Sequence, residues 1–120
     1  MFRPPRGIIL NVDISKLDIY LLLALADGAA HGYAVMQGIR ERSAGAVRVS
    51  TASFYRRLSA LIAGGLVEET GGPRQDDPRR GAYYRLTAAG RRALQDERDR
   101  LASLVAAVDG LRPASRRGRA

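Results

Sequence analysis

The fold of this chain is decided by residues 50–65, which read STASFYRRLSALIAGG. Large apolar residues, beginning with Phe54 and Leu58, recur there every three or four positions, as they do on the buried face of an α-helix. Ser50 is a good N-cap, because its hydroxyl can accept a hydrogen bond from a first-turn amide. The Gly-Gly pair ends the pattern. The stretch therefore predicts a helix over residues 51–63 with one buried face.

The opposite face of this helix is polar and free of acids. From position 42 to position 67 the chain has four arginines and no acidic residue, so this surface is locally positive. The major groove of DNA admits one α-helix, whose N-terminal residues contact base edges. An ordinary solvated face is the alternative interpretation. The candidate DNA-binding residues here are Ser50, Thr51, Ser53, Tyr55, Arg56 and Arg57.

Three ring-bearing side chains in or before this helix, Tyr55, His31 and Tyr33, can each be interpreted in more than one way. Tyr55 either packs at the helix edge or directs its hydroxyl to a phosphate, and we favour a mixture of both. His31 begins the second predicted helix, where a turn or capping role is favoured over a sensor role. Tyr33 follows it, and we expect that ring to pack in the core.

Two further helices precede the decisive stretch. The first, residues 16–26, has Ser15 as its N-cap and is apolar on nearly all sides, which predicts burial or a shared surface. The second, residues 31–43, turns apolar residues such as Val35 inward. Residues 47–49 alternate apolar and polar, which favours a short strand.

A hairpin follows the decisive stretch. Residues 66–70 and 82–87 are typical of strands, and the segment between them is rich in Gly, Pro and Asp. Such a hairpin beside a DNA-reading helix is a wing, which usually contacts phosphates and adds affinity more than sequence choice. A solvated turn is the alternative. The basic residues expected at its tip are Arg74, Arg79 and Arg80.

The last predicted helix, residues 88–109, has Thr87 as its N-cap and Gly110 beyond its end. Apolar residues recur along it every seven positions in two rows, a pattern typical of a coiled-coil seam. We therefore expect two copies of the chain to pair along this helix. The predicted dimerisation residues are Leu94, Leu101, Leu104, Val105 and Val108.

The 120 residues fit one domain, and the net charge of +8 lies mainly in the two tails. All 12 acids lie between positions 13 and 109, where the charge is nearly balanced. The predicted organisation has four parts: an N-terminal arm (1–12), a DNA-binding domain (13–87), a dimerisation helix (88–111) and a basic disordered tail (112–120).

Composition argues against several classes of function. The chain has no cysteine and a single histidine, and it lacks a phosphate-binding Gly-rich loop. We therefore expect no catalytic residues, no metal and no cofactor. No apolar run reaches the roughly 20 residues of a membrane span, and the N-terminus is not typical of a signal peptide. A cytoplasmic protein that is not an enzyme is the expectation.

Several short motifs occur in unbroken order over residues 17–110. They are LLAL (22–25), HGY (31–33), STASFYRRL (50–58), GLVE (65–68) and YYRLT (83–87). In this order they resemble the PadR-type family of transcriptional regulators, in its short subclass with one C-terminal helix. The resemblance implies a mainly α-helical winged helix-turn-helix with a small β-hairpin, followed by a dimerisation helix.

The resemblance also implies a function. Members of the family typically act as homodimers that bind a palindromic operator in double-stranded DNA, repress transcription and release DNA when a small, often aromatic, effector binds. Two alternatives stay open from the residues alone. One is a winged-helix adaptor that binds proteins, and the other is a protein that binds nucleic acids without sequence preference.

Overall fold

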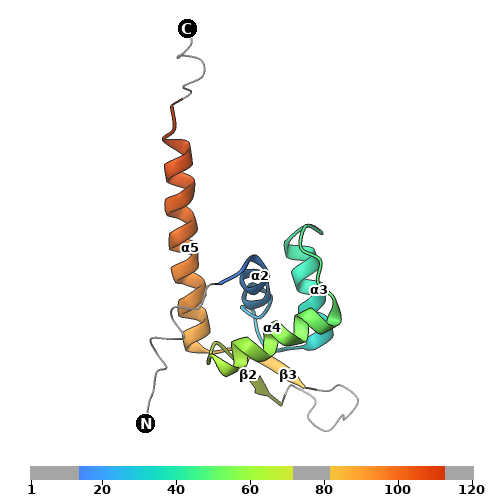
Figure 1. Ribbon diagram of the computed structural model, residues 1–120. Coiled ribbons are helices and arrows are strands. Elements are labelled where there is room, and N and C mark those ends of the chain that lie inside the picture. The colour runs from blue at the N-terminus through green and yellow to red at the C-terminus, as the bar shows by residue number, and fades with distance from the viewer. Residues whose placement is uncertain (1–13, 72–81, 113–120) are drawn as a thin grey trace.

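The computed structural model describes residues 14–71 and 82–112 (Figure 1). The helices and the hairpin strands follow the predicted order, with a small three-stranded sheet among the helices, so the mainly α-helical fold class is confirmed. Figure 1 shows three helices gathered beside the sheet and a fourth that projects away from them. The elements are α2 (Lys16–Ala24), β1 (Ala30–His31), α3 (Gly32–Arg42), α4 (Thr51–Ala63), β2 (Val67–Thr70), β3 (Tyr83–Leu86) and α5 (Ala88–Asp109).

Residues with hydroxyl side chains are the N-caps of three of these helices, as predicted. Ser50 accepts a hydrogen bond from the Ser53 amide at 3.1 Å, and Thr87 accepts one from the Gly90 amide at 2.9 Å. At α2, Ser15 and Asp18 form a reciprocal capping box. Each cap satisfies a first-turn amide that has no acceptor within its own helix. Local sequence therefore defines where α2, α4 and α5 begin.

The core is built from the apolar faces of α2, α3 and α4, closed by the sheet. The all-round apolar α2 lies in the middle, which explains why its sequence lacks a clear polar face. Burial of these side chains is the main force that holds the helices together. The buried core residues are Leu21, Leu22, Leu25, Val35, Ile39, Phe54, Leu58, Leu61, Leu66, Val67 and Leu86.

The sheet has the order β1-β3-β2 and is antiparallel throughout. The predicted hairpin of β2 and β3 is confirmed, with Val67 opposite Leu86 and Thr70 opposite Tyr83. The third strand, β1, was not predicted. It contains two residues only, too few for an alternation to show in a sequence.

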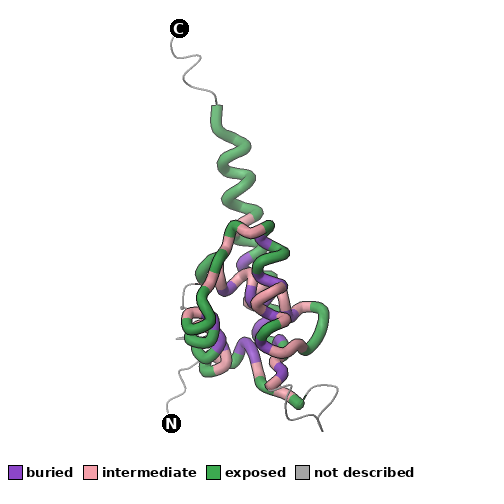
Figure 2. The backbone as a smooth tube through the Cα atoms, turned by 90° about the vertical axis from the view of Figure 1, so that its right-hand side faces the viewer, coloured by how far each residue is buried: buried purple, intermediate pink, exposed green. Residues whose placement is uncertain are grey.

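The N-terminal half of α5 packs closely on the rest of the chain. A Cβ atom on Gly90 would collide with the backbone oxygen of Leu66, so glycine permits this close approach. The helix then leaves the domain, and every residue from 102 to 112 is exposed (Figure 2). The two halves of this helix therefore have different surroundings, although the apolar pattern runs through both.

Three local predictions were wrong. Residues 47–49 form no strand, although Val47 and Val49 are half-buried and Arg48 is exposed. The alternation is real, but the Val47 amide donates to the Ser43 hydroxyl at 3.0 Å instead of joining a ladder. The α2 helix ends at Ala24, two residues early. Tyr33 is 67% exposed rather than in the core, because it lies on the side of α3 opposite the buried residues.

Candidate nucleic-acid interface

The outer face of α4 matches the predicted one in most positions. The helix buries three apolar side chains against the core, and Ser53 at its edge is half-buried. Ser50, just before the helix, is exposed as well as capping it. The exposed residues of the helix are Thr51, Ala52, Tyr55, Arg56, Ser59, Ala60 and Ala63.

Arg57, by contrast, points away from the outer face of α4 and toward α2. Its Nε donates to Asp18 Oδ1 at 2.9 Å and its terminal nitrogen donates to Asp18 Oδ2 at 2.8 Å. Asp18 is fully buried, while the Arg57 side chain remains 34% exposed. This hydrogen bond, with the nearby carboxylate charge, raises the pKa of Arg57 against the opposing effect of burial. The pair connects α2 to α4.

The sequence pattern placed Arg57 beside Arg56 on the outer face and did not predict this ion pair. One signal could have revealed it. Asp18 is the only charged residue after the first position of an otherwise apolar helix. A buried carboxylate is costly unless it is paired and hydrogen-bonded. The capping box accounts for part of this requirement, and an arginine from another helix completes it.

Tyr55 combines packing with exposure. Its ring lies edge-on to Phe54, with centroids 4.8 Å apart and an interplanar angle of 78°. A Cβ atom on Gly32 would collide with the Tyr55 hydroxyl, so this ring rests against the beginning of α3. The hydroxyl therefore lies where α3 and α4 meet. The packing half of the predicted mixed role is confirmed, and contact with a phosphate stays a prediction.

His31 acts as the cap that the sequence favoured. Its Nδ1 accepts a hydrogen bond from the Ala34 amide at 3.4 Å, and its ring lies edge-on to Tyr83 with centroids 5.6 Å apart. On the same β3 strand, burial raises the pKa of Tyr84, helped by the negative charge of Glu69. These contacts connect the beginning of α3 to the sheet.

The strands that carry the wing hold one ion pair of their own. Arg85 on β3 donates to Glu68 on β2 at 2.6 Å, directly across the hairpin. The predicted tip residues Arg74, Arg79 and Arg80 lie outside the described residues. So do the N-terminal arm and nearly all of the basic tail.

The predicted dimerisation residues divide into two groups. Leu94 packs against the core of its own chain, and Leu101 is half-buried. Leu104, Val105 and Val108 are 53%, 59% and 57% exposed, and all three lie on the projecting part of one helix. Between α2 and the first part of α5 lies a cavity of about 380 Å³. Its lining residues are Ile19, Leu23, Leu94, Gln95, Glu97, Arg98 and Leu101.

The part of the chain that the structure describes contains neither a metal-binding cluster nor a membrane-spanning helix. Within residues 14–71 and 82–112, no group of three or more His, Cys, Asp or Glu side chains could hold a metal ion. None of the helices in the same ranges is both long and apolar enough to cross a bilayer.

Solved structures share this fold. A PadR family transcription regulator from Clostridium difficile R20291 has a TM-score of 0.68 at 20% identity, over 79% of this chain and 96% of that chain. A transcriptional regulator from Clostridium thermocellum has a TM-score of 0.65 at 19% identity, over 78% and 89%. A protein from Streptococcus mutans UA159 has a TM-score of 0.61 at 23% identity, over 83% of this chain and 91% of that chain.

The sequence itself identifies the family. No curated protein matches it. The family model described as the transcriptional regulator PadR-like family matches residues 21–96, which is more than half of the chain. The match runs from the core of α2 through the whole helix-turn-helix and the hairpin strands to the first part of α5. The chain therefore belongs to the PadR-like family of transcriptional regulators.

Proposed function

We propose that this chain is a repressor that binds duplex DNA sequence-specifically as a homodimer, with α4 as the helix that enters the major groove. The observation that carries the proposal is the exposed, acid-free face of α4. On it Arg56 has no ion-pair partner among the described residues. A free guanidinium can form two hydrogen bonds to a guanine edge, the commonest specific contact in the major groove.

The projecting half of α5 supports the dimer. Its apolar residues are exposed in a row that continues the cavity beside α2, and a monomer rarely leaves such a row uncovered. A second copy packed along the same row would cover both. Two-fold symmetry would then present two α4 helices to half-sites about one helical turn apart, roughly 34–36 Å, and the operator would be palindromic.

Selection of bound sequences from a random duplex pool tests the DNA-binding proposal. The expected result is a palindrome whose half-sites are separated by about 10 base pairs or a multiple of that spacing. Bound DNA without any common sequence would contradict specific recognition. A single unrepeated site would contradict the symmetric dimer.

The dimer has its own test. Replacing Leu101 and Leu104 with Glu puts charge on the seam, and we expect monomers in sedimentation and poor operator binding. Ala102→Glu with Ala106→Glu is the matched control, because it adds the same charge to exposed positions outside the seam. If the variant with Glu at positions 101 and 104 remains a dimer in sedimentation, the proposed seam is wrong.

The cavity between α2 and α5 supports a further part of the proposal, release of DNA by a small apolar effector. Apolar side chains from both helices line it, and a ligand there would touch α2, the helix whose Asp18 binds Arg57 of α4. We expect small aromatic compounds to lower operator affinity when titrated into the protein–DNA complex. Binding of such a compound without any change in affinity would contradict this part.

A further inference from the structure

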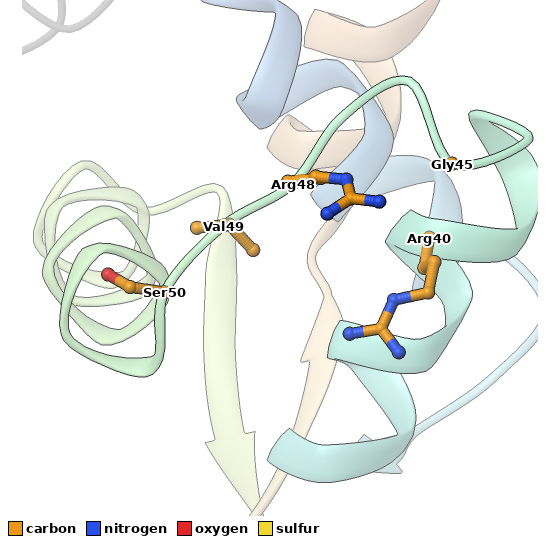
Figure 3. Close-up of a pocket in the computed structure, with 5 residues that line it drawn as sticks. All are labelled: Arg40, Gly45, Arg48, Val49 and Ser50. Atoms are coloured by element: carbon orange, nitrogen blue, oxygen red, sulfur yellow. The ribbon is translucent and has the colours of Figure 1, made fainter.

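A second basic feature lies beside α4, and none of the predicted DNA-binding residues except Ser50 belongs to it. It is a cavity of about 560 Å³ between α3 and the segment that leads into α4. Figure 3 shows the guanidinium groups of Arg40, from α3, and Arg48, from the segment, extending into the same space. The remaining lining residues are Gly45, Val49 and Ser50.

Among the residues that the structure describes, no acidic side chain balances the charge in this cavity. The Arg40 side chain donates to the neutral side-chain oxygen of Gln37, at 3.4 Å. Within residues 14–71 and 82–112, neither Arg40 nor Arg48 has an acidic partner. The neighbouring Arg42 differs, because it pairs with Asp27 at 3.3 Å. Two exposed guanidinium groups facing one space repel each other, and an anion between them removes the repulsion.

The turn that carries Arg48 is held in place by hydrogen bonds. The hydroxyl of the buried Ser43 donates to the backbone carbonyl oxygen of Arg40 at 3.3 Å and accepts from the Val47 amide at 3.0 Å. The Gly45 amide also donates to the Arg40 oxygen, at 2.9 Å, with Gly45 in the left-handed region at φ 82°. These bonds connect the backbone of the turn just before Arg48 to that of Arg40, so binding requires ordering of the two side chains and little of the backbone.

We propose that Arg40 and Arg48 together bind one backbone phosphate of the DNA. The inference rests on the proposed function, because the cavity adjoins the first turn of α4. A helix that enters the major groove by its N-terminal residues brings the preceding segment close to the sugar-phosphate backbone. Arginine suits this role, since its planar fork matches phosphate oxygens. The contact adds affinity and orients α4, and it reads no base.

The salt dependence of binding to random-sequence duplex DNA tests this inference without knowledge of the operator. The full-length Arg40→Gln/Arg48→Gln variant should bind random and selected duplexes more weakly by a similar factor. The slope of log K against log salt should become shallower by about 0.9 for each phosphate that the variant no longer neutralises. If the two arginines share one phosphate, each single variant should show most of the weakening seen in the double variant.

Arg42→Gln is the matched control, because it removes one arginine from the same helix whose charge Asp27 already balances. Its salt slope should stay close to that of the wild type. Thermal unfolding should be alike in all variants, since these side chains are exposed.

The outcomes separate the two proposals. A wild-type protein that binds no duplex DNA overturns the proposed function and the phosphate site with it. A wild type that binds while the double variant keeps its salt slope overturns the phosphate site alone. So does a weakening confined to the selected sequence, which would indicate base contacts. Stabilisation of the wild type alone by inorganic phosphate, with the DNA slope unchanged, would indicate a free anion instead.

Discussion

The inner edge and the outer face of α4 carry adjacent arginines with different surroundings. Arg57, at the inner edge, binds the buried Asp18 and so connects two helices of one chain. Arg56, one position earlier and about 100° around the helix, is exposed and has no ion-pair partner among the described residues. The difference shows that a basic helix face can combine a structural arginine with one available to a partner.

The largest expected effect comes from the inner edge. Arg57→Ala leaves the Asp18 carboxylate buried without its cation, and we expect a decrease of about 3 kcal/mol in the free energy of unfolding. Arg56→Ala should change it by no more than about 0.5 kcal/mol, as at other exposed positions. Urea unfolding measures both. Equal decreases would mean that the Asp18–Arg57 pair contributes little to stability.

A double-mutant cycle sharpens this result. Asp18→Asn removes the carboxylate charge, so adding Arg57→Gln to it should cost less than Arg57→Gln alone. Additive effects would show that the two side chains do not interact in solution.

The next effect concerns the outer face. We expect Arg56→Ala to weaken binding to the selected operator by about 1–3 kcal/mol, roughly 5- to 150-fold, and to relax the preference for one base. Fluorescence anisotropy with operator and random duplexes measures the ratio. Unchanged affinity for the operator would remove Arg56 from the base-reading surface.

The first turn of α4 provides a smaller effect. Ser50→Ala removes the acceptor for the Ser53 amide, and we expect a decrease of about 1 kcal/mol in stability. Ser59→Ala is the matched control, because Ser59 is exposed in the middle of the same helix. There alanine should be neutral or slightly stabilising, as the better helix former. If both changes had the same effect on thermal unfolding, the cap would be unimportant.

The smallest effect is expected at Tyr55, which is both packed against Phe54 and partly exposed on the outer face of α4. Tyr55→Phe retains the edge-on contact with Phe54, so stability should change by less than about 0.5 kcal/mol. Removal of the hydroxyl should still weaken DNA binding if that group donates to a phosphate. Tyr55→Ala, which removes the ring as well, separates the packing role from the polar one. Equal stability of the Phe and Ala variants would contradict the packing role.

Features that depend on near neighbours were predictable from the sequence. The caps at Ser15, Ser50 and Thr87 satisfy amides within the same turn, and the buried face of α4 follows from the helical period. The β2–β3 hairpin follows from two strand patterns that flank a turn-rich segment. The caps and the helical face depend on groups a few residues apart, and each hairpin strand shows its own pattern on either side of the turn-rich segment.

Features that depend on tertiary packing or on the geometry of a turn were not predictable. The amide of Val47 could join a ladder only if a strand lay beside it, and the Ser43 hydroxyl accepts it instead. Tyr33 is apolar enough for a core position, yet α3 turns that side to solvent. The phosphate site proposed for Arg40 and Arg48 was missed because eight positions separate them and a turn brings them together.

The sequence by itself determined the family, and it determined the order of the helices and the positions where they begin, because periodicity and capping act within a few residues. Only the tertiary structure decided which arginine is structural, since Asp18 and Arg57 are 39 positions apart and meet through the packing of α2 and α4. The tertiary structure likewise decided which half of the apolar row along α5 is covered by the rest of the chain. Leu94 packs on its own chain, whereas Leu104 lies beyond the reach of the domain and stays exposed.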